Sequence, residues 1–199
     1  NAAGGNDGSG GEAREGEGEG GGRGDFGDFG KNPFAASADN AIIISGGKIT
    51  VNADGDGIDS NGGLYVNAGE IVVFGPVNGG NGALDSSGEA VIRGGSVIAL
   101  GASQMAENFG ADSEQCSILV SVSGMQAAGT TVELRDSSGE VLMSCVSPKA
   151  YNSAVFSCGD IQVGQTYTAV MGQETVEVEM TDTIYGSGMR FGPGGGFGG

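Results

Sequence analysis

Apolar and polar residues alternate along residues 41–101, and the alternation repeats in three segments. Aligned on their glycines, the segments read IIISGGKITVNA, LYVNAGEIVVFG and AVIRGGSVIALG, which places Gly47, Gly69 and Gly95 in register. The steps between these glycines are 22 and 26 residues, from Gly47 to Gly69 and from Gly69 to Gly95. Repeats of this length with a period of two are typical of a β-solenoid, in which short strands alternate with turns.

One set of alternate positions is apolar in all three segments, which predicts a core of stacked side chains. The four predicted ladders are Ile42/Leu64/Ala90, Ile44/Val66/Ile92, Ile49/Ile71/Val97 and Val51/Val73/Ala99.

The opposite, outward positions become more apolar toward the C-terminus, as in Thr50/Val72/Ile98 and Asn52/Phe74/Leu100, and Tyr65 also points outward. An outward apolar strip indicates a contact surface. Two interpretations remain open here: the strip packs against the C-terminal part of the same chain, or a sugar ring stacks on Tyr65 or Phe74.

Residues 117–180 have a different pattern, which predicts short strands joined by turns. The segments are SILVSVSGM, TTVELRD, EVLMSCV, SAVFSC, QTYTAVM and ETVEVEM, and RDSSGE is a hairpin signal. We therefore expect an all-β protein: a solenoid of about three coils with a small antiparallel β cap at its C-terminal end.

Glycine-rich segments flank this region, and NAAGG at 1–5 aligns with DSNGG at 59–63. The predicted division is a partial coil (1–5), a Gly-rich acidic insertion (6–38), coils (39–115), the cap (116–185) and a Gly-rich tail (186–199). A chain that begins in the middle of a coil leaves an open apolar cross-section, which we expect further coils or another chain to cover. Because the chain opens on Asn1, we expect a processed or truncated product.

The amino-acid composition excludes several classes of function. The chain has 25 acidic and 8 basic residues, no histidine and a net charge of −17. Such a chain repels nucleic acid and anionic membranes, and it can form neither a His-ligated zinc site nor a Ser-His or Cys-His pair. Apolar runs near ~18 residues are absent, so we expect no membrane insertion.

Three cysteines, Cys116, Cys145 and Cys158, are too few for a disulfide scaffold. They are either buried free thiols or one bridge with a remaining thiol, and in the second case Cys145 and Cys158 are the favoured pair.

The string DGDGIDSNG at 54–62 carries the candidate chemistry. The repeat register places Asp59 beside Asp85 of the next coil, at about 4.8 Å if the strands pair. Two such carboxylates repel each other unless they share a proton, meet a basic residue or bind a cation. Calcium, supported by Asp54, Asp56 and nearby amide and carbonyl oxygens, is one remedy, and an Asn/Asp ladder bonded to turn amides is the other. The string is not an EF-hand, because Ile58 stands where that loop needs Asp or Asn.

The segments ISGGKITVNADGDGIDSNG, GPVNGGNGALDSSG and RGGSVIALGASQMA closely resemble secreted bacterial carbohydrate-binding β-helix proteins, which bind cellulose and pectin-type polysaccharides. The similarity continues through residues 121–157 and covers roughly 40–170. It implies a right-handed parallel β-helix, an extracellular or cell-surface location, calcium and non-catalytic glycan binding. Asp54, Asp56, Asp59 and Asp85 are then the expected metal ligands. Tyr65, Phe74 and Asn81 are the expected glycan contacts.

We therefore expect a non-catalytic, calcium-supported protein that binds a cell-wall or acidic polysaccharide, for example in adhesion. The alternative is a structural subunit of an extracellular fibre or surface assembly, in which solenoids or Gly/Phe-rich tails join copies of the chain. A glycan hydrolase or lyase is disfavoured, because Lys48 and Arg93, the basic residues of the coils, are not at the aspartate corner.

Overall fold

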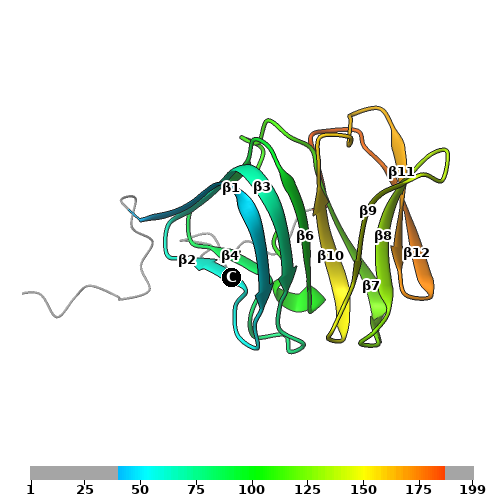
Figure 1. Ribbon diagram of the computed structural model, residues 1–199, viewed down its shortest axis with the longest axis horizontal. Helices are drawn as coiled ribbons and strands as arrows, with labels where there is room; N and C mark the ends of the chain where they lie inside the picture. The colour runs from blue at the N-terminus through cyan, green and yellow to red at the C-terminus, as the bar shows by residue number, and fades with distance from the viewer. Residues whose placement is uncertain (1–39, 187–199) are drawn as a thin grey trace, which may run out of the picture. The chain divides into compact units, whose positions relative to one another are not determined.

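A computed structural model of the protein describes residues 40–186, and this part of the chain is mostly β-structure, as predicted. It contains no α-helix within those bounds, only the 3₁₀ turn η1 (Ser103–Met105). The strands form a seven-stranded mixed sheet, a four-stranded antiparallel sheet and a two-stranded parallel sheet (Figure 1). In chain order the strands are β1 (Ala41–Asn52), β2 (Ile58–Ser60), β3 (Gly63–Phe74), β4 (Leu84–Ser86), β5 (Ala90–Ile92), β6 (Ser96–Gly101), β7 (Ser117–Gln126), β8 (Thr131–Asp136), β9 (Val141–Val146), β10 (Tyr151–Ser157), β11 (Thr166–Met171), β12 (Glu174–Glu179) and β13 (Ile184–Tyr185).

The three repeat segments pair in parallel with the register that the sequence predicts. β1 pairs with β3, and β3 pairs with both β5 and β6. All four inward ladders are present, for example Ile49 opposite Ile71 and Ile71 opposite Val97. β2 and β4 form a second parallel pair, which places Ile58 opposite Leu84.

The aligned glycines mark corners where consecutive segments approach closely. Gly69 and Gly95 have φ angles of +118° and +93°, which side-chain-bearing residues rarely adopt. A Cβ atom on Gly95 would lie 2.6 Å from the carbonyl oxygen of Gly69, and one on Gly69 would lie 3.0 Å from that of Gly47. Stacking at this corner therefore requires glycine in successive segments.

The six C-terminal segments form strands as predicted, but they divide between two sheets. β8, β9, β11 and β12 make the four-stranded antiparallel sheet in the order β12-β11-β8-β9. β10 and β7 instead continue the seven-stranded sheet, whose order is β1-β3-β6-β10-β7-β13, with β5 also paired to β3. The predicted boundary at residue 116 thus falls just before β7, a strand that shares a sheet with the repeat segments. The short strand β13 had no sequence signal.

The seven-stranded sheet separates two apolar cores. The inner core lies between this sheet and the β2–β4 pair; the outer core lies between it and the four-stranded sheet. Val155 of β10 packs in the inner core and Phe156 packs in the outer core, so each face of this strand contributes to a different core. All seven residues of β10 are buried as a result. Strands buried on both faces are usually apolar throughout. YNSAVFS departs from this, because Asn152, Ser153 and Ser157 are buried as well, and each is hydrogen-bonded to a neighbouring segment.

The outward apolar strip is covered by the chain's own C-terminal part, the first of the two interpretations given above. Ile98 and Leu100 are buried in the outer core beside residues of β8 and β11, and Phe74 packs against that core. Only 4% of the surface of Ile98 and 1% of that of Leu100 is exposed to solvent.

Several predictions lie outside the described residues: the partial coil at 1–5, the Gly-rich insertion at 6–38 and nearly all of the tail at 186–199. The three cysteine thiols are free in the structure, so the Cys145–Cys158 bridge is not formed. Within residues 40–186, there is no helix of the length and apolarity that a bilayer crossing requires.

Substitution of the same residue type in adjacent strands should test the inward ladders. Ile71 of β3 is 1% exposed, whereas Ile43 of β1 is 63% exposed. We expect Ile71→Ala to lower the free energy of unfolding by about 2–5 kcal/mol, because it leaves a cavity in the inner core. Ile43→Ala should cost less than about 1 kcal/mol. Chemical denaturation measures both values, and equal losses would contradict the assigned ladders.

Candidate functional site

The β2–β4 pair presents aspartates in register on its outer side. Asp59 is paired with Asp85, between the pairs Ile58/Leu84 and Ser60/Ser86. Ile58 and Leu84 are buried in the inner core, so the alternation of the strands turns the two aspartates away from it. We call Asp56, Asp59 and Asp85 the acidic edge.

Asp54 is neutralised by a residue that lies far away in the sequence. Its Oδ1 lies 2.7 Å from Nζ of Lys149, which follows β9. The same Nζ donates to the carbonyl oxygen of Ala53 at 2.5 Å. Lys149 lowers the pKa of the Asp54 carboxyl, which is itself fully exposed. Asp54 therefore belongs to an ion pair that ties the turn after β1 to the C-terminal part of the chain.

Asp56 bonds to turn amides, as the hydrogen-bonded alternative predicts. Its Oδ1 accepts the backbone N–H of Gly82 at 2.7 Å. In the amide orientation that satisfies its neighbours, the side-chain nitrogen of Asn81 donates to Asp56 Oδ2 at 3.2 Å. Backbone bonds from Gly57 to Gly82 and from Ile58 to Ala83 join the same two turns. Asp56 and Asn81 thus act first as structural links between the turn before β2 and the turn before β4.

Among the described residues, Asp59 and Asp85 have neither a basic partner, as Asp54 has, nor an amide donor, as Asp56 has. Within residues 40–186, neither carboxylate accepts a hydrogen bond or forms an ion pair. Burial raises the pKa of Asp85 above its ordinary value of 3.8, and the nearby charges of Asp56 and Asp59 raise it further. The carboxylates of the acidic edge therefore lie close enough together to repel one another.

The basic side chains of the described chain are engaged elsewhere. Their ion pairs are Lys48 with Glu70, Arg93 with Glu114, Arg135 with Glu133, and Lys149 with Asp54. None of these pairs reaches Asp59 or Asp85.

The side chains of the described residues do not form a complete calcium site. Across residues 40–186, no three His, Cys, Asp or Glu side chains lie close enough together to hold a metal ion. The expected set of Asp54, Asp56, Asp59 and Asp85 is therefore not assembled into one cluster. Calcium takes six to eight oxygens, so a pair such as Asp59 and Asp85 supplies only part of its shell.

The expected glycan contacts lie in different surroundings. Tyr65 is half-buried, with the guanidinium carbon of Arg93 5.7 Å from its ring centroid and its hydroxyl 3.4 Å from Glu89 Oε2. Phe74 packs against the outer core. Tyr65, rather than Phe74, therefore keeps an aromatic surface with charged neighbours.

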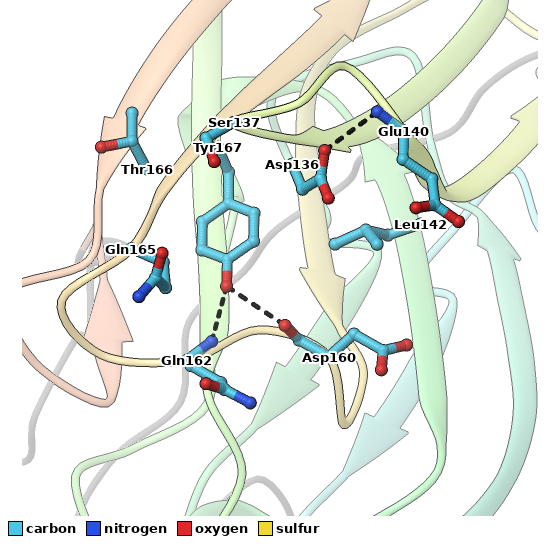
Figure 2. Close-up of a pocket in the computed structure, with 9 residues that line it drawn as sticks. All are labelled: Asp136, Ser137, Glu140, Leu142, Asp160, Gln162, Gln165, Thr166 and Tyr167. Carbon is cyan, nitrogen blue, oxygen red and sulfur yellow. Dashed lines mark hydrogen bonds between the residues drawn. The ribbon is translucent and has the colours of Figure 1, made fainter.

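A separate concave surface of about 420 Å³ lies beside the β8–β9 hairpin (Figure 2). The residues around it are Asp136, Ser137, Glu140, Leu142, Asp160, Gln162, Gln165, Thr166 and Tyr167. Two of its polar groups are already satisfied by local bonds. Asp136 Oδ1 accepts from the Ser138 hydroxyl at 2.7 Å, which holds the pKa of Asp136 below its usual value. The Tyr167 hydroxyl accepts from the Gln162 N–H at 2.7 Å and donates to the Asp160 carbonyl at 3.1 Å.

Sequence reasoning missed Lys149 and this concave surface. Lys149 lies 96 residues from Ala53, its backbone acceptor, and no local pattern reports that contact. The concave surface brings a predicted hairpin turn beside the loop that contains Asp160 and Gln162, and only the hairpin had a sequence signal.

Comparison of the chain with known protein families, with curated proteins and with solved structures found no match.

Removal of one charge should test the coupling within the acidic edge. In Asp59→Asn we expect the pKa of Asp85 to fall, because a repelling charge is lost. It should stay above 3.8, because burial is the larger cause of the shift. NMR titration of the aspartate carboxyl carbons measures this pKa. Asp54→Asn is the control and should leave the titration of Asp85 unchanged; an unchanged titration in Asp59→Asn would disprove the coupling.

Proposed function

We propose that this protein is a non-catalytic, extracellular or cell-surface protein that binds an acidic cell-wall polysaccharide with the help of calcium. The observation that carries the proposal is the register pair Asp59/Asp85, which no basic residue of the described chain neutralises. The resemblance to carbohydrate-binding β-helix proteins supplies the ligand class.

The proposal includes a finer interpretation of the fold. β1, β3 and β6 stack in parallel, and β2 and β4 stack in parallel beside them, with offsets of 22 residues between β1 and β3 and 26 between β2 and β4. We interpret these segments as coils of a right-handed parallel β-helix, with the C-terminal strands as its cap. The right hand is the one that parallel crossovers nearly always take.

Calcium would act as a bridge between protein and polymer. Both partners are acidic, so direct contact between them is repulsive. A cation held by Asp59 and Asp85 retains open coordination positions, because two carboxylates do not complete its shell. Carboxylates of a polymer such as polygalacturonate would fill those positions. Tyr65 offers a ring face for a sugar, and Arg93 beside it adds a positive charge.

The position of the nearest base supports the non-catalytic part of the proposal. Proton abstraction by a lyase needs a free base beside the cation. Lys149, the basic residue nearest the aspartate turns in the described chain, is held by Asp54 and Ala53 and is 17% exposed. We therefore expect polygalacturonate incubated with the protein to gain no reducing ends and no unsaturated products.

Sedimentation with insoluble polygalacturonate tests calcium-dependent binding. We expect the protein to sediment with the polymer in calcium and to remain in solution in a chelator. Asp59→Asn/Asp85→Asn should remain in solution even in calcium, because the cation loses both anionic ligands.

The matched control is Asp112→Asn/Glu177→Gln, which removes the same charge at exposed positions elsewhere and should bind like the unchanged protein. Equal binding with and without chelator would eliminate the calcium bridge. Absence of binding to polygalacturonate, cellulose and other cell-wall glycans would eliminate the carbohydrate-binding function.

The edge strand β1 favours a second candidate function, a structural subunit of an extracellular assembly. Among residues 40–186, β1 pairs with β3 alone, so no described strand pairs with the other edge of β1. Its inward residues Ile42, Ile49 and Val51 are half-buried, whereas their β3 partners are almost completely buried. Strand edges of this kind pair readily with another chain.

Light scattering at increasing protein concentration tests assembly through β1. If copies join there, the apparent mass rises with concentration, and Ile43→Lys abolishes the rise by placing a charge on the edge. Val163→Lys, at a 51% exposed position remote from β1, should behave like the unchanged protein. A strictly monomeric protein at all concentrations would eliminate this candidate.

A further inference from the structure

The backbone register of β7 and β10 aligns two cysteines. These antiparallel neighbours pair Phe156 with Ile118 and Ser157 with Ser117 at the ends of the strands. One further step along both chains places Cys158 opposite Cys116. The chains remain together at that step, because the Ser157 hydroxyl donates to the Cys116 carbonyl oxygen at 2.6 Å.

Both thiols also lie on the same face of the sheet. Phe156 and Ile118 face the outer core, and side chains two residues farther along a strand return to the same face. Cys158 and Cys116 are members of that core, with 7% and 9% exposure. The charges of both thiols act on the pKa of Tyr167, which places them near one hydroxyl.

The hydrogen-bond pattern fixes the separation expected between the two chains. The N–H of Ser117 donates to Thr183 at 3.0 Å, on the side away from β10. Ser117 and Ser157 are therefore a non-hydrogen-bonded pair. Continued by one step, the ladder would give Cys116 and Cys158 the spacing of a hydrogen-bonded pair, with Cα atoms about 5.5 Å apart. Disulfides join Cα atoms that lie about 4.4–6.8 Å apart.

We propose that Cys116 and Cys158 form a cross-strand disulfide in an oxidising compartment and that Cys145 remains a free thiol. Cys145 is on β9, in the four-stranded sheet, where its backbone partner is Val132 of β8. A Cys145–Cys158 bond would have to cross from one sheet to another, whereas Cys116–Cys158 joins adjacent strands of one sheet.

The oxidant is a small-molecule disulfide such as oxidised glutathione. One cysteine thiolate attacks it, forms a mixed disulfide and releases one glutathione thiolate. The second cysteine thiolate then attacks the protein sulfur of the mixed disulfide and releases the second glutathione. One S–S bond forms and one breaks, and the two protons of the cysteines pass through solvent to the released thiolates.

This exchange belongs to folding rather than to the finished structure. Burial raises the pKa of both thiols, so the folded protein offers little thiolate for attack. The bond then forms as β7 and β10 come together, and the closed core protects it afterwards.

Refolding of the full chain in a glutathione redox buffer, followed by tryptic digestion without reduction, tests the proposal. Cleavage at Arg93, Arg135, Lys149 and Arg190 puts each cysteine on its own peptide: 94–135, 136–149 and 150–190. We expect mass spectrometry to find 94–135 linked to 150–190 and one reactive thiol per chain. The oxidised protein should melt roughly 5–15 °C above its reduced form, because the bond closes a long loop.

The serine variants provide the controls. Cys145→Ser should keep the linked peptides and show no reactive thiol, whereas Cys116→Ser should show no link to 150–190. A link between 136–149 and either other peptide would overturn the proposal. Three reactive thiols after refolding to the native circular dichroism spectrum would also overturn it.

Discussion

In-register parallel pairing is the constraint on which the rest of this structure depends. It places each residue of one segment beside the equivalent residue of the next, whatever that residue is. On the inner side this produces ladders of apolar side chains, as in Val51, Val73 and Ala99. On the outer side the same rule brings Asp59 against Asp85, although like charges repel. The stable core and the unfavourable acidic pair are therefore two results of one geometry, and a cation is a remedy that leaves the register intact.

The C-terminal strands β10 and β7 extend the sheet of the parallel repeat and add a second core to it. β10 and β7 pair beyond β6 and carry the inner ladder onward, since Val155 lies opposite both Ala99 and Leu119. Their other face helps to form the outer core with the four-stranded sheet. The C-terminal end of the repeat is thus closed by strands of the same sheet. Lys149, in the connection just before β10, then reaches back to Asp54.

The repeat made much of this structure predictable. Its glycines and alternating residues were enough to predict the register of every inward ladder, and turn residues marked the strands of the C-terminal part. The sequence did not show that β7 and β10 join the first sheet, because this pairing is non-local and no local pattern says which sheet a short strand joins. At the site, local spacing identified Asp59 and Asp85. It could not separate Asp54 and Asp56 from them, because the partners of these two residues, Lys149 and Gly82, come from other parts of the chain.

The sheet shared by the two cores limits how this chain can be divided or recombined. A fragment that ended before β7 would uncover Ile98 and Leu100 and leave one edge of β6 unpaired. A fragment that began at β7 would lack the strands that complete the opposite face of β10. Neither half is a transferable module. The smallest portable unit therefore includes both cores and the sheet between them.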